Sequence, residues 1–184
     1  MSVPRLGKYA RLELERRYLL RHLPPDWVED RPHWHIVDRY IINTRLRLRR
    51  MTSASGQPTI YKFGQKYRDV SQHETQRTMT NLYLDEAEYL ALAQLEAREV
   101  VKRRYRYEHK SGVYSIDLFE GKLTGLILAE IEAQTEAELA GLTPPSFALK
   151  DVTDDPFFSG GRLAMLTEQT FQLELARRLG DEAD

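Results

Sequence analysis

Residues 11–20 read Arg-Leu-Glu-Leu-Glu-Arg-Arg-Tyr-Leu-Leu, and this stretch decides the fold. The charged side chains Glu13, Glu15 and Arg17 recur at every second position, with leucines and an arginine between them. Side chains two residues apart lie on one face of a β-strand, whereas on a helix they point about 200° apart and do not converge. The stretch therefore predicts a strand that carries one charged face.

Short segments with the same alternation follow along the chain, separated by turns that contain glycine or proline. Together with residues 11–20 they make about eight strands with short connections, a pattern typical of an antiparallel sheet or barrel. The further strands are expected at residues 33–42, 44–50, 59–63, 75–84, 99–107, 113–119 and 126–133.

Helices are fewer than strands. Asp85 and Glu88 have the spacing of a capping box, which predicts a helix start. A short helix is predicted at residues 136–140, and the leucine and phenylalanine stripes of residues 162–179 predict a C-terminal helix. The fold class is therefore mainly β, in one domain over residues 1–184, with a few packing helices.

Composition excludes several classes of protein. The chain has 27 Lys and Arg against 28 Asp and Glu, and this net charge of −1 argues against a uniformly basic nucleic-acid-binding protein. The charges are unevenly divided, with a net +8 in residues 1–110 and −9 in residues 111–184. The absence of Cys excludes disulfides and thiolate metal sites. No apolar run approaches the roughly 18 residues of a membrane span, so we expect a cytoplasmic protein with no membrane partner.

Like charges stand side by side on several predicted strands. Arg45, Arg47 and Arg49 recur at intervals of about 6.6 Å on one strand face. Any single charged face has an ordinary alternative, which is that it points to water. Like charges in a row repel, however, and a bound polyanion would relieve the repulsion between the arginines.

Glutamates repeat this spacing with the opposite sign, in residues 13–15 and again at Glu130 and Glu132. A cation would relieve their repulsion, and oxygen ligands favour a hard ion such as Mg²⁺ or Mn²⁺. These patterns predict a closed barrel with a charged interior, in which a carboxylate sector binds metal and a basic sector binds phosphate. The apolar outer faces of the strands would then be covered by the helices.

Seven segments resemble, in order, the CYTH domain of the triphosphate tunnel metalloenzymes. The Glu-x-Glu opening alone is common, but the ordered series runs from about residue 11 to 166 and is specific. The matching segments are residues 13–20 with the Glu-x-Glu signature, 45–49 with Arg-x-Arg, 61–62 with Tyr-Lys, 102–105 with Lys-x-Arg-Tyr, 115–121 with the Asp-containing strand, 128–132 with the late Glu-x-Glu, and 152–155 with Val-Thr-Asp.

The resemblance implies an eight-stranded antiparallel tunnel that binds a triphosphate together with Mg²⁺ or Mn²⁺. It implies metal ligands among the acidic residues, phosphate ligands among the basic ones, and a tyrosine that contacts the basic residue of the signature. The implied metal residues are Glu13, Glu15, Asp117, Glu130 and Glu132; the implied phosphate-binding residues are Arg45, Arg47, Arg49, Lys62, Arg77, Lys102 and Arg104; the implied catalytic residues are Arg17, Tyr40 and Lys62.

Two positions depart from the family pattern. Arg17 stands where the signature has Lys, and its forked guanidinium would hold a phosphate differently. Met79 and Asn81 stand where many active members have Glu. A carboxylate there would help to bind a second metal ion or to orient the attacking water, so the neutral pair favours binding over fast hydrolysis.

The leading prediction is a metal-dependent hydrolase of inorganic triphosphate or a small organic triphosphate. Its partner would be a small-molecule triphosphate or polyphosphate, and nucleic acid is not expected. Two alternatives stay open: an adenylate cyclase on the same fold, and a protein that binds polyphosphate or nucleotides without turnover.

Overall fold

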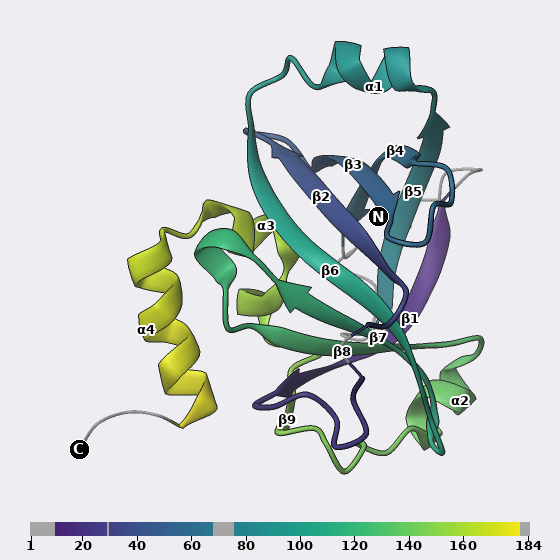
Figure 1. Ribbon diagram of the computed structural model, residues 1–184, viewed down its shortest axis with the longest axis vertical. Coiled ribbons are helices and arrows are strands. Elements are labelled where there is room, and N and C mark those ends of the chain that lie inside the picture. The colour runs from purple at the N-terminus through teal and green to yellow at the C-terminus, as the bar shows by residue number, and fades with distance from the viewer. Residues whose placement is uncertain (1–9, 29, 68–75, 181–184) are drawn as a thin grey trace, which may run out of the picture.

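A closed barrel of eight antiparallel strands forms the centre of the molecule (Figure 1). The computed structural model describes residues 10–28, 30–67 and 76–180, with the backbone alone at 66, 67, 76 and 77. Around the barrel the order is β1, β8, β7, β6, β2, β3, β4 and β5, and β5 pairs with β1 to close the sheet. The strands are β1 (Arg11–Leu20), β2 (His33–Ile41), β3 (Leu46–Ser53), β4 (Ile60–Tyr67), β5 (Gln76–Leu84), β6 (Ala97–His109), β7 (Gly112–Phe119) and β8 (Ile127–Ala133).

Strand β1 joins the two ends of the sheet. Its first residues, Arg11–Leu14, pair with β5, and Leu14–Leu20 pair with β8. A two-residue strand, β9 (Lys150–Asp151), pairs with β1 beside Tyr18 and Leu19. The inward face of β1 therefore lies where the sheet closes, and its charged residues belong to the barrel interior.

The predicted fold class and the eight strands are confirmed, with shifts at the strand ends. One such shift concerns the strand expected at residues 44–50, which begins at Leu46 and continues to Ser53. Asn43 has a left-handed φ of 58°, and Thr44 donates its backbone N–H to Ile41, so these residues form the turn between β2 and β3.

Helix α1 (Glu86–Leu92) starts at the predicted capping box. Asp85 accepts the backbone N–H of Glu88 at 2.8 Å, and Glu88 accepts that of Asp85 at 2.9 Å. The predicted short helix is α2 (Glu136–Gly141), which packs against β1 and β8 and is capped by Thr135. A single 3₁₀ turn, η1 (Gly121–Leu123), precedes β8.

The C-terminal segment differs from the prediction of one helix over residues 162–179, which is wrong. A 3₁₀ turn, η2 (Pro156–Phe158), is followed by α3 (Gly160–Met165) and a separate helix, α4 (Glu168–Leu179). The break lies at Leu166, whose ψ of 145° is extended, and at Thr167, whose hydroxyl caps α4. The break lets α3 pack on β6 while α4 packs on η1, as Figure 1 shows beside the barrel.

Apolar packing lies mainly outside the barrel and across one of its ends. Phe171 and Leu175 of α4 are buried, whereas Leu173, on the other side of that helix, is 68% exposed. A second cluster packs loop residues such as Trp27 and Phe147 onto Tyr107 of β6. Because apolar groups cover the outer strand faces, the barrel interior is left to charged side chains, as predicted.

None of the described helices has the length and the apolar character needed to cross a membrane.

Candidate functional site

Inward-facing charged residues alternate along the strands and meet in the barrel interior. On β1 they are Glu13, Glu15 and Arg17, at the spacing that the sequence predicted. Burial is unusual for such residues: Glu15 is 4% exposed and Arg17 is 9% exposed. The charged residues that line the interior cavities are Arg11, Glu13, Glu15, Arg17, Asp38, Arg47, Arg49, Lys62, Lys102, Arg104, Glu130 and Glu132.

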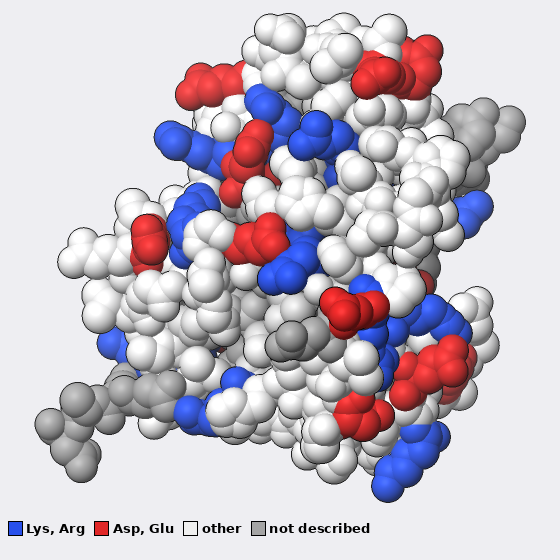
Figure 2. All heavy atoms as spheres, viewed as in Figure 1, with Lys and Arg blue, Asp and Glu red and all other residues white. Residues whose placement is uncertain are grey.

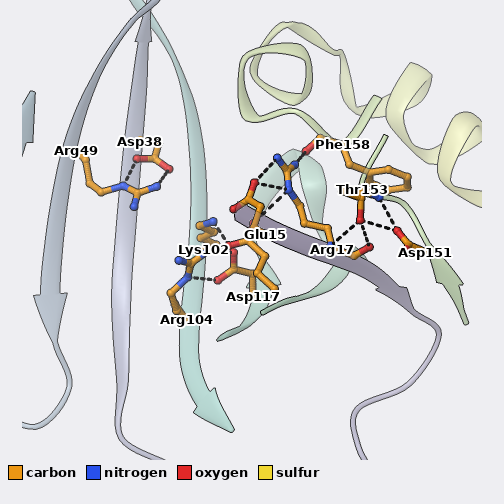
Figure 3. A network of polar contacts seen from close by, with 11 residues as sticks. Glu15, Arg17, Asp38, Arg49, Lys102, Arg104, Asp117, Asp151, Thr153 and Phe158 are labelled. Carbon is orange, nitrogen blue, oxygen red and sulfur yellow. Dashed lines mark hydrogen bonds and ion pairs between the residues drawn. The ribbon is translucent and has the colours of Figure 1, made fainter. Parts of the chain in front are cut away.

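Asp38 is a site residue that the sequence analysis missed. It lies on β2 and is 2% exposed, and its two oxygens accept Nε and Nη2 of Arg49 at 2.5 and 2.7 Å (Figure 3). Arg47 Nε lies 3.5 Å from the same carboxylate. Burial would raise the pKa of Asp38, but Arg49 and Arg47 outweigh burial and hold it well below its ordinary value. The alternation of Asp38 with Tyr40 on one strand face was the available signal.

Asp117 of β7 is a second buried carboxylate that pairs with two cations, Lys102 and Arg104. It is fully buried, and it accepts Lys102 Nζ at 2.5 Å and two nitrogens of Arg104 at 2.6 Å each (Figure 3). Arg104 also pairs with Glu130. Burial would lower the pKa of Arg104, but the two carboxylates raise it well above its ordinary value. Asp117, implied as a metal residue, is thus held between two cations.

Arg17 joins the barrel to the C-terminal segment. Its Nη2 and Nε donate to Glu15 at 3.0 and 3.2 Å, and its Nη1 donates to the backbone carbonyl of Phe158 at 2.9 Å (Figure 3). Its backbone N–H donates to the hydroxyl of Thr153 at 3.0 Å. Arg17 therefore holds both the Glu15 carboxylate and η2. Its Nε also lies 3.8 Å from Oε1 of Glu130.

Tyr40 lies at the same end of the cavity as Arg17. Burial and the charge of Asp38 raise the pKa of its phenol, which is therefore neutral at pH 7. Its hydroxyl packs against the backbone of Gly160, where an added Cβ would lie 1.8 Å from the hydroxyl oxygen. Tyr40 thus contacts α3, and Arg17 binds η2 immediately before it.

The four glutamates of β1 and β8, which are Glu13, Glu15, Glu130 and Glu132, line the same cavity. Glu15 and Glu132 are directly opposite each other across the two strands, a destabilising arrangement for like charges. Burial, then Glu13 and Glu15, raise the pKa of the Glu132 carboxyl. Carboxylates in this arrangement have the oxygen chemistry that a hard divalent cation requires.

The described side chains do not converge into a ready-made ligand set. No group of three or more acidic or His side chains in the described residues is close enough to hold a metal ion. Glu15 is turned to Arg17 and Glu130 to Arg104. The donors therefore fit a divalent ion by chemistry and charge, whereas their coordination would require these two ion pairs to loosen.

The remaining predicted residues lie in different surroundings. Lys62 on β4 lines the cavity, with its ammonium 5.0 Å from the ring centre of Tyr83. Arg45 is exposed in the turn before β3 and is not among the residues that line the two interior cavities. The backbone of Arg77 pairs with Glu13, but its side chain lies outside the described residues.

Two neutral residues of β5, Met79 and Asn81, complete the wall. Both line the cavity, and the amide nitrogen of Asn81 lies 3.2 Å from the sulfur of Met79. Gly64 of β4 makes room for them, since an added Cβ there would lie 2.7 Å from the amide oxygen of Asn81. Met79 and Asn81 themselves bring no charge to the cavity.

The described residues enclose two adjoining cavities that share Glu13, Arg47, Arg49, Met79, Arg104 and Glu132. The inner one has a volume of about 100 Å³ and the outer one about 450 Å³. The outer volume lies in the range of small-molecule sites. Together they form a tunnel lined by acidic and basic side chains in close contact.

No protein-family model matches the chain, and no curated protein sequence matches it. Two solved structures of NE1496, one named a hypothetical protein and the other an inorganic triphosphatase, are similar with TM-scores of 0.55 and 0.54. Each is 23% identical and covers 84% of this chain, with 99% and 95% of those chains aligned. A proposed adenylate cyclase (bh2851) from Bacillus halodurans has 12% identity and a TM-score of 0.49, covering 96% of this chain and 94% of its own.

At 23% identity, the similarity between this chain and NE1496 is a similarity of fold. The fold of NE1496 is matched over nearly the whole of that chain. The barrel of this chain closes through β1 and β5 and encloses the rows of charged side chains that the resemblance implied. The chain therefore has the fold of the triphosphate tunnel proteins, also called the CYTH fold.

Proposed function

We propose that this protein is a metal-dependent hydrolase of inorganic triphosphate or a small organic triphosphate. The observation that carries the proposal is the pairing of buried carboxylates with partly buried arginines that line the cavity, at Asp38–Arg49 and Asp117–Arg104. Buried charges are costly, and a protein retains them where they serve a charged ligand. The similarity to an inorganic triphosphatase supports the choice of ligand.

The basic residues would bind the phosphate oxygens. Arg49 and Arg104 have planar forks that suit phosphate, and each is held by a carboxylate that fixes its direction. Lys102 and Lys62 add ammonium donors from the neighbouring strands. Because the forks are already oriented, little side-chain entropy is lost when the anion binds.

The carboxylates of Glu13, Glu15, Glu130 and Glu132 would hold Mg²⁺ or Mn²⁺. When bound, the metal ion would neutralise charge on the triphosphate and polarise the phosphoanhydride bond toward water. Tyr40, as a neutral phenol, could donate a hydrogen bond to a phosphate oxygen. Arg17 would act mainly on Glu15, since that carboxylate and the Phe158 carbonyl already take three of its N–H donations.

A phosphate-release panel tests the proposal. Purified protein is assayed with Mg²⁺ or Mn²⁺ against inorganic triphosphate, ATP, thiamine triphosphate and longer polyphosphate. We expect release from at least one triphosphate, and a loss of at least about tenfold in kcat/KM in Glu13→Gln, equivalent to about 1.4 kcal/mol. Glu99→Gln is the control, because Glu99 pairs with Arg39 on the outer surface. No release from any triphosphate contradicts the enzymatic proposal.

A second function, binding without turnover, is favoured by Met79 and Asn81. These neutral residues line the cavity beside Glu13, so the β5 wall supplies no carboxylate to hold a second metal ion or to orient water. Calorimetry decides between the two: tight triphosphate binding combined with no phosphate release supports this second function.

A further inference from the structure

One aromatic ring is left open at the end of β5. Tyr83 is 73% exposed, whereas every other Tyr, Phe and Trp side chain that the structure describes is buried or half-buried. It is the second-to-last residue of β5, where the chain leaves the barrel for α1 (Figure 1). Most of the apolar surface of this ring is therefore in contact with water, which is unfavourable unless something covers it.

The register of the sheet turns Tyr83 toward the interior. Tyr83 is directly opposite Lys62 of β4, and residues opposite each other in an antiparallel pair point to the same face. Lys62 lines the outer cavity, and so do Asn81 and Met79, the inward residues that precede Tyr83 at every second position of β5. Tyr83 thus continues this inward row by one position, at the edge of the outer cavity.

Tyr61, which precedes Lys62, shows the contrast with an outward tyrosine. The centre of its ring lies 4.7 Å from that of Tyr89 in α1, and its hydroxyl donates to Glu86 at 3.2 Å. Helix α1 therefore occupies Tyr61 on the outer face of the sheet. Tyr83 points to the other face, and none of the aromatic rings in the described residues packs against it.

Lys62 connects the Tyr83 ring to the arginines of the cavity. Its ammonium lies 5.0 Å from the ring centre, a cation–π contact. Lys62 is also directly opposite Arg49 of β3, so Arg49, Lys62 and Tyr83 form one row across three neighbouring strands, on the same face. Two cations followed by a ring match, in order, the phosphates and then the aromatic group of an organic triphosphate.

We propose that Tyr83 determines specificity by stacking on a planar aromatic group that is joined to the triphosphate. When Lys62 turns to a phosphate oxygen, the ring face that it covered becomes free for the ligand. Stacking uses the face of the ring and removes apolar surface of both partners from water. This inference rests on the proposed function and narrows it, because inorganic triphosphate has nothing to place on Tyr83.

Matched ligands test the inference with the intact protein. ATP carries a planar base, and ribose 5′-triphosphate has the same sugar and phosphates without it. Each is used with an imido group in place of the outermost bridging oxygen, so that it binds without turnover. By calorimetry with Mg²⁺ we expect the ATP analogue to bind wild type about tenfold more tightly than the ribose analogue.

Variants of Tyr83 locate this preference. In Tyr83→Ala the two analogues should bind equally, with the affinity for the ribose analogue changed by less than about twofold, since only the stacked base is lost. Tyr83→Phe should keep the preference, because stacking needs the ring and not the hydroxyl. An exposed side chain at this position makes normal folding of both variants the expectation.

The control is Leu82→Ala. Leu82 is the adjacent residue, 55% exposed on the opposite face of β5, and its removal should leave both affinities unchanged. Binding elsewhere on the surface is disfavoured on the face shown in Figure 2, where acidic and basic side chains are interspersed and give a polyanion no continuous basic surface.

The outcomes separate this inference from the proposed function. If both analogues bind wild type equally well, or if Tyr83→Ala weakens both to the same extent, Tyr83 does not stack on the base and the proposed function stands. A preference that is lost equally in Leu82→Ala also overturns the role of Tyr83. If neither analogue nor inorganic triphosphate binds, both proposals are wrong. If Tyr83→Ala alone abolishes the preference but wild type releases no phosphate from any triphosphate, the stacking role holds and the enzymatic proposal fails.

Discussion

Individual residues inside the barrel are held by charge pairs. Asp38 is the clearest case, because it is 2% exposed and its carboxylate accepts both nitrogens of the Arg49 fork. Removal of one member of a buried pair leaves the other uncompensated, which costs about 3–5 kcal/mol. Such pairs fix the directions of the arginines and make the site sensitive to single substitutions.

Asp38→Asn should lower the free energy of unfolding by about 3–5 kcal/mol at pH 7. The pKa of Asp38 is depressed in the folded protein, so its stabilising contribution is present above the ordinary carboxyl pKa of about 3.9 and is lost as the pH falls below it. The difference from wild type should therefore shrink below pH 4. Urea unfolding at several pH values measures it, and Glu99→Gln, in an exposed pair, should cost less than about 1 kcal/mol.

Glu132 illustrates the opposite situation. Burial and the neighbouring Glu13 and Glu15 raise its pKa, so its charge is unfavourable in the folded protein without metal. Glu132→Gln should raise the melting temperature of the metal-free protein at pH 7 and weaken Mn²⁺ binding. Differential scanning calorimetry and Mn²⁺ paramagnetic resonance measure the two effects. A lower melting temperature in the variant would contradict the repulsion between these carboxylates.

At the scale of secondary-structure elements, helix α3 lines one side of the cavity. Helix α3 approaches the tunnel so closely that Gly160 touches the hydroxyl of Tyr40, and a Cβ at Gly160 would overlap it at 1.8 Å. At Gly161 an added Cβ would lie 3.9 Å from the Tyr40 ring, an ordinary contact. Gly161 can therefore accept a side chain without moving its neighbours, whereas the adjacent Gly160 cannot.

Gly160→Ala should destabilise the protein by about 1–3 kcal/mol, because α3 must shift away from Tyr40. Gly161→Ala should be neutral or stabilising by up to about 1 kcal/mol, since Ala favours a helix over Gly. Thermal unfolding of the two variants gives the comparison. Equal effects at the two positions would show that α3 does not pack against Tyr40.

Met79 of strand β5 lines both cavities and places a neutral side chain in their wall. Met79→Glu adds a negative charge near Arg49 and the carboxylates. We expect triphosphate affinity without metal to fall by about tenfold or more through like-charge repulsion, while Mn²⁺ affinity rises. Calorimetry measures both affinities. Met79→Gln, similar in length but neutral, is the control and should change each by less than about threefold.

At the scale of the whole molecule, the tunnel couples ligand binding to the stability of the barrel. Ligand contacts would join strands that are not hydrogen-bonded neighbours, β3 to β6 and β6 to β8. A ligand that binds only the folded state at 100 times its Kd stabilises by about 2.7 kcal/mol. For a chain of this size that amount raises Tm by about 5–10 °C. Inorganic triphosphate should produce this shift, and sulfate at matched ionic strength should not.

The sequence by itself determined the barrel and most of the charged wall. Period-two alternation is a local property, so it correctly predicted eight strands and the inward faces of β1, β3, β6 and β8. The capping box at Asp85 and Glu88 is also local, and the start of α1 was correct. Local patterns succeed here because strand geometry assigns each side chain to a face without reference to other strands.

Only the tertiary structure decided which charges meet. Asp38 pairs with Arg49 because β2 and β3 are adjacent in the register that sets these residues opposite each other. Arg17 binds Phe158, which is 141 residues away along the chain, because η2 folds back onto β1. The break at Leu166 and Thr167 follows from packing α3 and α4 onto different surfaces. These contacts depend on distances between segments remote in sequence, which no local pattern encodes.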